Sequence, residues 1–111
     1  MTEKAQKYLY DILNAIELIE LFSEGVDTFN AYRADLKTKS AIERQVAIIG
    51  EAVTHFKKQE TEVVLSNMPQ IIAVRNRLIH AYDHVEDQVI WKIVEQHLSP
   101  LKLEVQKALE L

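Results

Sequence analysis

Apolar residues recur three or four positions apart along most of the chain, which is the spacing of amphipathic helices. The first such stretch predicts a helix from Glu3 to about Phe22, with apolar positions at Tyr8, Ile12, Ala15, Ile16, Ile19 and Phe22. Gly25 then suits a helix C-terminal cap. Asp27 can cap a short helical piece that extends through Tyr32.

A second long helix is predicted after a polar segment that runs to Lys39. Ser40 and Glu43 form a capping box. An apolar stripe then continues to Gln59 through Ile42, Val46, Ile49, Val53 and Phe56. Gly50 lies inside this helix, where it costs roughly 1 kcal/mol relative to Ala. We therefore expect another helix to cross closely at that level.

Two further helices are predicted in the second half of the chain. The segment 67–69, Asn-Met-Pro, presents a cap followed by a proline suited to the first helical turn, so a third helix is expected from there to about His80. Asp83 with Glu86 forms another capping box, which opens a fourth helix. Pro100 should kink or restart that helix. Its apolar stripe continues to the C-terminus at Val89, Ile90, Ile93, Val94, Leu98, Leu101, Val105 and Leu109.

The composition agrees with an all-helical chain. Its 111 residues have room for one domain, residues 1–111, and two Gly and two Pro provide few turns. The sequence shows no alternating pattern typical of strands. The prediction is an all-α, up-and-down bundle of four principal helices plus a short extra helix.

Charge, cysteine content and hydropathy restrict the classes of function. The chain has no Cys, which excludes disulfide staples and thiol catalysis. No apolar region follows a basic start, and no apolar run approaches the roughly 18 residues of a membrane span, so we expect a soluble, cytoplasmic protein without a membrane partner. The net charge of −4 argues against non-specific coating of nucleic acid but leaves room for a local basic site.

The richest polar chemistry lies in residues 74–82, Val-Arg-Asn-Arg-Leu-Ile-His-Ala-Tyr. Asn76 and His80 are four apart and share a helix face, and the long Arg75 side chain can reach toward that face from the turn below. Tyr82 joins this cluster only if the helix ends near His80. We expect these side chains to form a small, positively charged edge of a cleft.

Such side chains suit the cleavage of RNA without a metal. When the 2′-hydroxyl attacks the adjacent phosphate, the reaction needs a base, an acid for the leaving oxygen, and positive charge against the pentacoordinate phosphate. His titrates near neutral pH, and Arg offers a planar fork to phosphate oxygens. A two-fold dimer that placed both copies of His80 across one cleft would supply base and acid together. The alternative is catalysis by one imidazole and water.

Simpler interpretations compete with this one. His and Arg at helix ends often only cap carbonyls or pair with carboxylates, and spacing alone favours that structural role. Glu51 and His55 have the spacing of two metal ligands, but the sequence places no third ligand. An intrahelical polar pair is the better account, and no metal is predicted. No Gly-rich phosphate loop and no nucleophilic Ser or Cys arrangement is present in the sequence.

Three sequence blocks, in this order along the chain, resemble those of the HEPN superfamily and in particular its HepT branch of prokaryotic toxin–antitoxin systems. Residues 41–52 resemble the helix-two block of that family. The signature follows as Arg75, four residues, His80, one residue, Tyr82. Residues 87–101 resemble the last helix. The resemblance therefore covers most of the chain.

The resemblance implies an all-α bundle that dimerises with its motifs facing. It also implies a metal-independent endoribonuclease that a cognate minimal nucleotidyltransferase antitoxin holds in check. Arg75 and His80 would be the catalytic residues, and Tyr82 would be the residue whose hydroxyl the antitoxin modifies with adenylyl groups from ATP. The supporting residues that carry over are Asn76, Glu51 and Arg44.

We therefore expect a homodimeric, HepT-like ribonuclease toxin that acts on RNA without a cofactor. The first alternative is a non-catalytic adaptor that binds nucleotide or nucleotidyltransferase through the same cleft, and the second is a plain structural dimer. Arg75, His80 and Tyr82 together favour the enzyme, because neither alternative needs a titrating His beside a phosphate-binding Arg.

Overall fold

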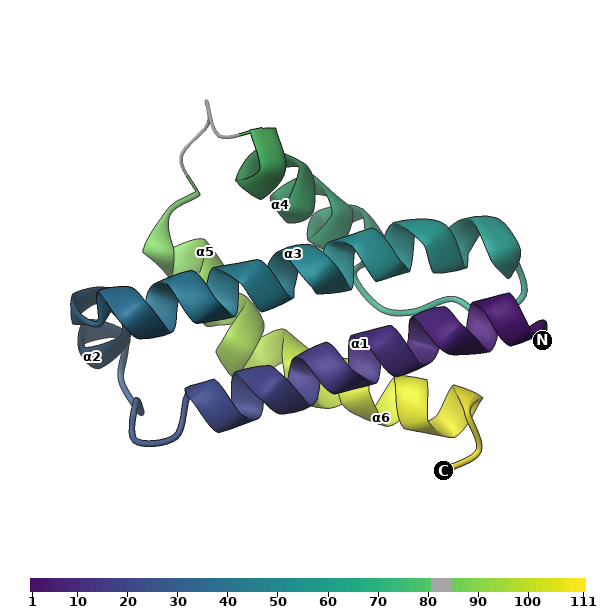
Figure 1. Cartoon of the computed structure of the whole chain (residues 1–111), viewed down its shortest axis with the longest axis horizontal. Coiled ribbons are helices and arrows are strands. Elements are labelled where there is room, and N and C mark those ends of the chain that lie inside the picture. The colour runs from purple at the N-terminus through teal and green to yellow at the C-terminus, as the bar shows by residue number, and fades with distance from the viewer. Residues whose placement is uncertain (81–84) are drawn as a thin grey trace.

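A computed structural model describes residues 1–80 and 85–111, and every regular element in these ranges is helical. Figure 1 shows the two long helices, α1 and α3, lying side by side and antiparallel, with the short α2 between their ends. The helix α4 packs across α3. The C-terminal arm, which consists of α5, η1 and α6, returns to α1 through α6. The bounds are α1 Glu3–Phe22, α2 Phe29–Ala34, α3 Leu36–Gln59, α4 Met68–His80, α5 Asp87–Lys92, a π-helical turn Ile93–His97 (η1) and α6 Leu98–Ala108. This architecture confirms the predicted all-α bundle.

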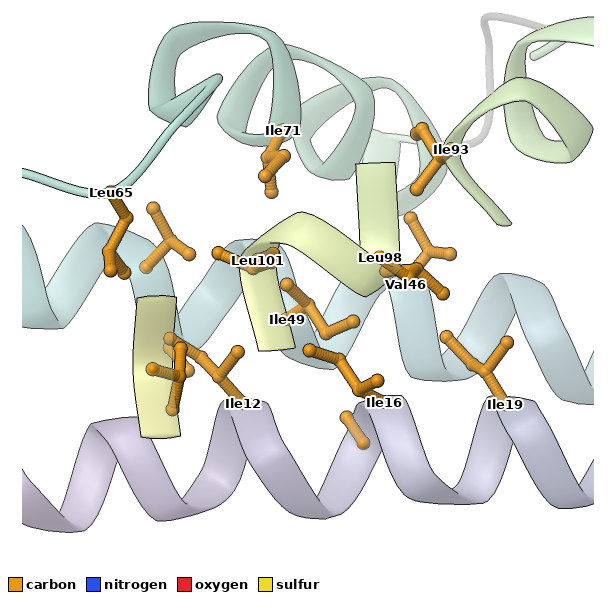
Figure 2. Close-up of a cluster of buried hydrophobic side chains, with 14 of the residues drawn as sticks. Ile12, Ile16, Ile19, Val46, Ile49, Leu65, Ile71, Ile93, Leu98 and Leu101 are labelled. Carbon is orange, nitrogen blue, oxygen red and sulfur yellow. The ribbon is translucent and has the colours of Figure 1, made fainter. Parts of the chain in front are cut away.

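The core lies between α1, α3, α4 and the C-terminal arm. Figure 2 shows isoleucines of α1 pointing toward side chains of α3, with residues of α4 and of the arm beside them. Each such side chain contributes roughly 1.5–3 kcal/mol when fully buried, so this cluster accounts for the association of the helices. Within the described ranges, no helix is long and apolar enough to cross a membrane. The labelled residues are Ile12, Ile16, Ile19, Val46, Ile49, Leu65, Ile71, Ile93, Leu98 and Leu101, all of them buried.

The first half of the chain follows the prediction except at its caps. The C-cap of α1 is Ser23 and not Gly25, which lies two residues further on with a φ of 79°, in a turn where the Val26 N–H donates to the Ser23 carbonyl at 2.9 Å. The cap of α2 is Thr28 and not Asp27, because the Thr28 hydroxyl accepts the N–H of Ala31 at 3.1 Å. The short helical piece itself is confirmed, and Tyr32 in it is fully buried.

The helix α3 begins at Leu36, so the predicted start at the Ser40 capping box was wrong. Asp35 caps the helix earlier, with one carboxylate oxygen accepting the Thr38 N–H at 3.0 Å and the other accepting the Thr38 hydroxyl at 2.8 Å. The two hydrogen bonds hold the pKa of Asp35 below its ordinary value of 3.8. The ionised Asp35 side chain satisfies the free N–H of Thr38 at the start of α3, so Ser40 lies inside the helix.

The helix α4 begins at Met68, with Pro69 in its first turn as predicted. The fourth helix starts later than expected: Glu86 has extended backbone, and α5 begins at Asp87. An ion pair of 3.0 Å between Asp87 and Lys39, both largely buried, ties this start to α3. Asp83, the other half of the predicted capping box, lies outside the described residues.

The irregularity expected at Pro100 is present. The backbone passes through the π turn η1 and restarts as α6 at Leu98, so Pro100 occupies the first turn of the new helix. The Leu98 N–H donates to the carbonyl of Ile93, five residues earlier, so a π turn precedes the proline, which is a common form of helix irregularity. The apolar stripe continues through this join, with Ile93, Leu98, Leu101 and Val105 all buried.

Candidate active site

The site is built where α4 crosses α3. Gly50 lies at the crossing, as its place inside a long helix predicted. A Cβ atom at this position would lie 2.2 Å from Cβ of Arg75, 2.7 Å from its Cγ and 3.2 Å from the carbonyl oxygen of Ile71. The absence of a side chain at Gly50 therefore lets the base of Arg75 pack directly on α3.

Two neighbours orient the guanidinium of Arg75. Its Nη2 donates to Oε2 of Glu51 on α3, and its Nη1 donates to Oδ1 of Asn76 at 2.9 Å. The side chain is 23% exposed, and its Nε is buried without a hydrogen-bond partner. Each terminal nitrogen carries a second N–H, and two such groups side by side match the oxygens of a phosphate. The guanidinium of Arg75 is thus a positive charge at the surface whose direction is fixed by Glu51 and Asn76.

Glu51 connects Arg75 to a second residue of α3. Its Oε1 accepts a hydrogen bond of 2.7 Å from Nε2 of His55, while its Oε2 accepts from Arg75. The hydrogen bond from His55 and the charge of Arg75 hold the pKa of Glu51 below its ordinary value of 4.5. The intrahelical pair of Glu51 and His55 is therefore confirmed. Within residues 1–80 and 85–111, no three His, Asp or Glu side chains are grouped as a metal site would need.

A groove of about 620 Å³ runs along this crossing. It brings together three of the residues singled out in the sequence, Arg44, Glu51 and Arg75, although the first and last are 31 positions apart. Two arginines and two glutamates line the groove, and the second N–H on each terminal nitrogen of Arg75 is the group that suits an anionic ligand. The lining residues are Ser40, Glu43, Arg44, Ala47, Ile48 and Glu51 of α3 and Arg75, Leu78 and Ile79 of α4.

His80 is the last residue of α4 and is exposed. It lies one helical turn beyond Asn76, so both residues occupy the same side of α4. The predicted break after His80 falls at the boundary of the described residues and stays a prediction. Tyr82 and His84 fall in the segment 81–84, outside the described residues.

One neighbour of the site was not anticipated. Tyr8 of α1 stacks on the ring of His55, with 5.2 Å between the ring centroids and an interplanar angle of 20°. The periodic pattern had assigned Tyr8 to the core stripe of α1, yet it is only half-buried. The sole signal for this contact would have been the antiparallel pairing of the first two long helices, because the start of α1 and the end of α3 then lie at the same end of the bundle (Figure 1).

Comparison with known proteins gives consistent matches. A family model described as "Ribonuclease HepT-like" matches residues 12–108. A protein of Thermococcus cleftensis named "Probable ribonuclease HepT" is 37% identical over 96% of this chain and 97% of its own length. A protein of Methanocaldococcus jannaschii named "Putative RNase MJ1380" is 31% identical over 89% of this chain and 91% of its own length. No solved structure gave a significant match.

Proposed function

Because this chain belongs to the HepT-like ribonuclease family, we propose that it is a metal-independent endoribonuclease whose site is the groove between α3 and α4. The observation that carries the proposal is the placement of Arg75. Its guanidinium is held by Glu51 and Asn76 in a groove that also contains Arg44, and His80 follows at the end of the same helix. A phosphate-binding cation and an imidazole are the minimal equipment for RNA cleavage.

The proposed reaction uses the RNA as its own nucleophile. The 2′-oxygen forms a bond to the adjacent phosphorus while its proton passes to a neutral His80 imidazole. The bond from phosphorus to the 5′-oxygen breaks, and that oxygen takes a proton from a protonated imidazole. Arg75 stabilises the pentacoordinate phosphate between these events. The products are a 2′,3′-cyclic phosphate and a free 5′-hydroxyl.

Two imidazoles are available if the enzyme acts as a homodimer. Each chain has one His80, so a two-fold axis near the end of α4 would place a base and an acid in one cleft. Leu78 and Ile79 line the groove beside Arg75, and Ile79 is 50% exposed. An apolar rim next to charged site residues is the kind of surface that a second protein chain covers.

The neighbours of Arg75 have supporting roles in this proposal. Glu51 and Asn76 fix the direction of the guanidinium, so that it needs no reorganisation when the phosphate arrives. Arg44 provides a second positive charge along the path of the RNA backbone. None of the three exchanges a proton with the substrate.

We also propose that the protein is the toxin of a toxin–antitoxin pair and that Tyr82 is its regulatory residue. The proposal rests on the motif that joins Arg75, His80 and Tyr82 in the sequence. A minimal nucleotidyltransferase antitoxin would join the Tyr82 oxygen to the α-phosphorus of ATP, with release of pyrophosphate and of the phenolic proton. The adenylyl group adds bulk and negative charge. That charge would compete with the RNA phosphate for Arg75.

An RNA cleavage assay with the purified protein tests the activity. Single-stranded RNA should be cut equally well with and without EDTA, and the fragments should end in 2′,3′-cyclic phosphate. An oligonucleotide with 2′-deoxyribose throughout should bind but remain intact, because it lacks the nucleophile. If the protein cuts no RNA but binds a nucleotidyltransferase tightly, the result would contradict the proposed enzyme and favour the non-catalytic adaptor.

A further inference from the structure

A second hollow of about 330 Å³ lies between α1 and α3. It shares Ile48 and Glu51 with the groove that contains Arg75, so the two hollows adjoin across these side chains. A strand whose phosphate lies on Arg75 therefore has a second concave surface directly beside it. The lining residues are Lys7, Tyr8 and Asp11 of α1 and Ile48, Glu51, Ala52 and His55 of α3.

One wall of this hollow is aromatic. Tyr8 and His55 stack at 5.2 Å between ring centroids with 20° between their planes. The His55 side chain is 41% exposed and Tyr8 is half-buried, so the stack is accessible from outside. Stacked rings of this kind are the surfaces on which proteins hold the bases of single-stranded RNA.

The charges that line the hollow are paired with neighbouring groups, which favours a neutral ring over a phosphate. Asp11 pairs with Lys7, and Glu51 accepts hydrogen bonds from His55 and from Arg75 of the adjoining groove. Lys7 donates to Asp11 at 2.7 Å, and its ammonium lies 5.2 Å from the centre of the Tyr8 ring. The edge of the hollow thus offers a donor and an acceptor side by side, which is what the edge of a nucleobase can bind.

We propose that the hollow lined by Tyr8 and His55 binds a nucleobase of the RNA next to the phosphate held by Arg75. The inference rests on the proposed ribonuclease function and adds a base-binding subsite to it. Arg75 and Arg44 bind the backbone, whereas a base stacks on an outer face of the Tyr8–His55 pair, because the inner faces of the two rings contact each other. Face stacking tolerates every base, so the subsite raises affinity more than it selects sequence.

Binding of uncleavable RNA tests the subsite. The probes are a 2′-O-methyl oligonucleotide, which lacks the nucleophile, and an oligomer of the same length and backbone without bases. The variants are Tyr8→Leu, which removes the ring, Tyr8→Trp, which keeps a ring, and Tyr10→Leu, which removes an exposed ring from the same helix outside the hollow. Circular dichroism confirms that each variant is folded.

One stacked base is worth roughly 5- to 150-fold in affinity. Wild type, Tyr8→Trp and Tyr10→Leu should therefore prefer the base-bearing oligomer by about fivefold or more. The preference should fall by about fivefold or more in Tyr8→Leu. Equal preferences in Tyr8→Leu and Tyr10→Leu, in an enzyme that cuts RNA, would overturn the subsite and leave the ribonuclease intact. If the wild-type protein neither binds nor cuts RNA, both the base-binding subsite and the proposed ribonuclease function would be contradicted.

A measurement on the wild-type protein covers the case in which Tyr8→Leu does not fold. An oligonucleotide with 4-thiouridine is bound and irradiated, and the crosslinked peptides are identified by mass spectrometry. Crosslinks should fall in the peptides that contain Tyr8 and His55. Crosslinks confined to other peptides would contradict the proposed position of the base.

Discussion

The side chain of Arg75 leaves α4 directly over Gly50 of α3, and a methyl group at Gly50 would come within 2.2 Å of Cβ of Arg75. Heavy atoms that are not bonded cannot approach so closely. The contact explains why a glycine occupies the middle of a 24-residue helix. It also explains how the next residue, Glu51, comes into hydrogen-bonding reach of the guanidinium. The position of Arg75 therefore depends on the absence of a Cβ atom at Gly50.

Gly50→Ala should lower RNA cleavage by about tenfold or more, because small displacements of a positioned group have large effects on rate. The better helix propensity of Ala favours the variant by roughly 1 kcal/mol, but overpacking costs about 1–3 kcal/mol. The net effect is a loss of up to about 2 kcal/mol of stability. Thermal unfolding and initial rates of cleavage measure the two effects separately.

The matched control is Gly25→Ala. Gly25 has a left-handed φ of 79° and no atom within 4 Å of the added methyl group, so the substitution costs about 1–2 kcal/mol through backbone strain alone. The two variants should thus have similar losses of stability and different losses of activity. Full cleavage by a folded Gly50→Ala protein would contradict the role given to the crossing.

Arg75→Ala and His80→Ala should each lower cleavage by about 10²- to 10⁴-fold while retaining the helical circular dichroism of the wild type. His80 is exposed and Arg75 only partly buried, so neither belongs to the apolar core. Arg33→Ala controls for the loss of a positive charge, since Arg33 lies on α2 over the ring of Phe29 and does not line the groove. A loss of less than about fivefold in either site variant would be too small for an acid–base or phosphate-binding role.

Glu51→Gln should change how stability depends on pH. The pKa of Glu51 is held below its ordinary 4.5, chiefly by the hydrogen bond from His55 and then by Arg75. A carboxyl group whose pKa is lowered by folding contributes stability above its unfolded pKa, and that contribution is lost as pH falls through the folded pKa. The side chain is 45% exposed, so solvent screening limits the contribution to under about 1 kcal/mol.

Urea unfolding at pH 7 and pH 3 measures this dependence. Wild type should be the more stable protein at pH 7, and the difference from Glu51→Gln should be smaller at pH 3. Glu95→Gln, at an exposed carboxylate of η1, controls for the loss of one negative charge. An equal difference at both pH values would show that Glu51 acts through packing and not through its charge.

The sequence predicted the helices well because their signals are local. The apolar stripe and caps of α1 need only neighbouring residues, and Gly50 implied a close crossing by its propensity alone. The same local signals failed where two caps competed, since Asp35 and Ser40 both precede good helical sequence. Asp35 comes earlier in the chain and accepts the N–H of Thr38, so the helix begins after Asp35 and not after Ser40.

The residue pairs that meet between helices could not be predicted from these patterns. Arg75 and Glu51 are 24 positions apart, and only their resemblance to a known family placed them in one site before the fold was known. Tyr8 fitted the apolar stripe of α1, although its ring also faces His55 across the bundle. A periodic pattern reports which side of a helix is buried but not which residue of another helix lies against it.

A homodimer with shared sites makes a prediction for mixed proteins. When His80→Ala chains are mixed with wild-type chains, the heterodimers should be sharply less active than half of wild type, because one cleft needs both imidazoles. Differently tagged chains allow the heterodimer to be purified before the assay. Half of the wild-type activity would indicate independent sites, and a monomer at micromolar concentration would remove the mechanism with two histidines.

Tyr82→Phe should separate regulation from catalysis. Phe keeps the aromatic ring and loses only the oxygen that would accept the adenylyl group, so the variant should cut RNA nearly as well as wild type. The nucleotidyltransferase and ATP should silence wild type and leave the variant active. Tyr10→Phe, at an exposed tyrosine of α1, is the matched control and should still be silenced. Intact-mass spectrometry after incubation decides the matter, because an adenylyl group on the Phe variant would place the modification at another residue. An unmodified wild-type protein would instead contradict the regulatory role proposed for Tyr82.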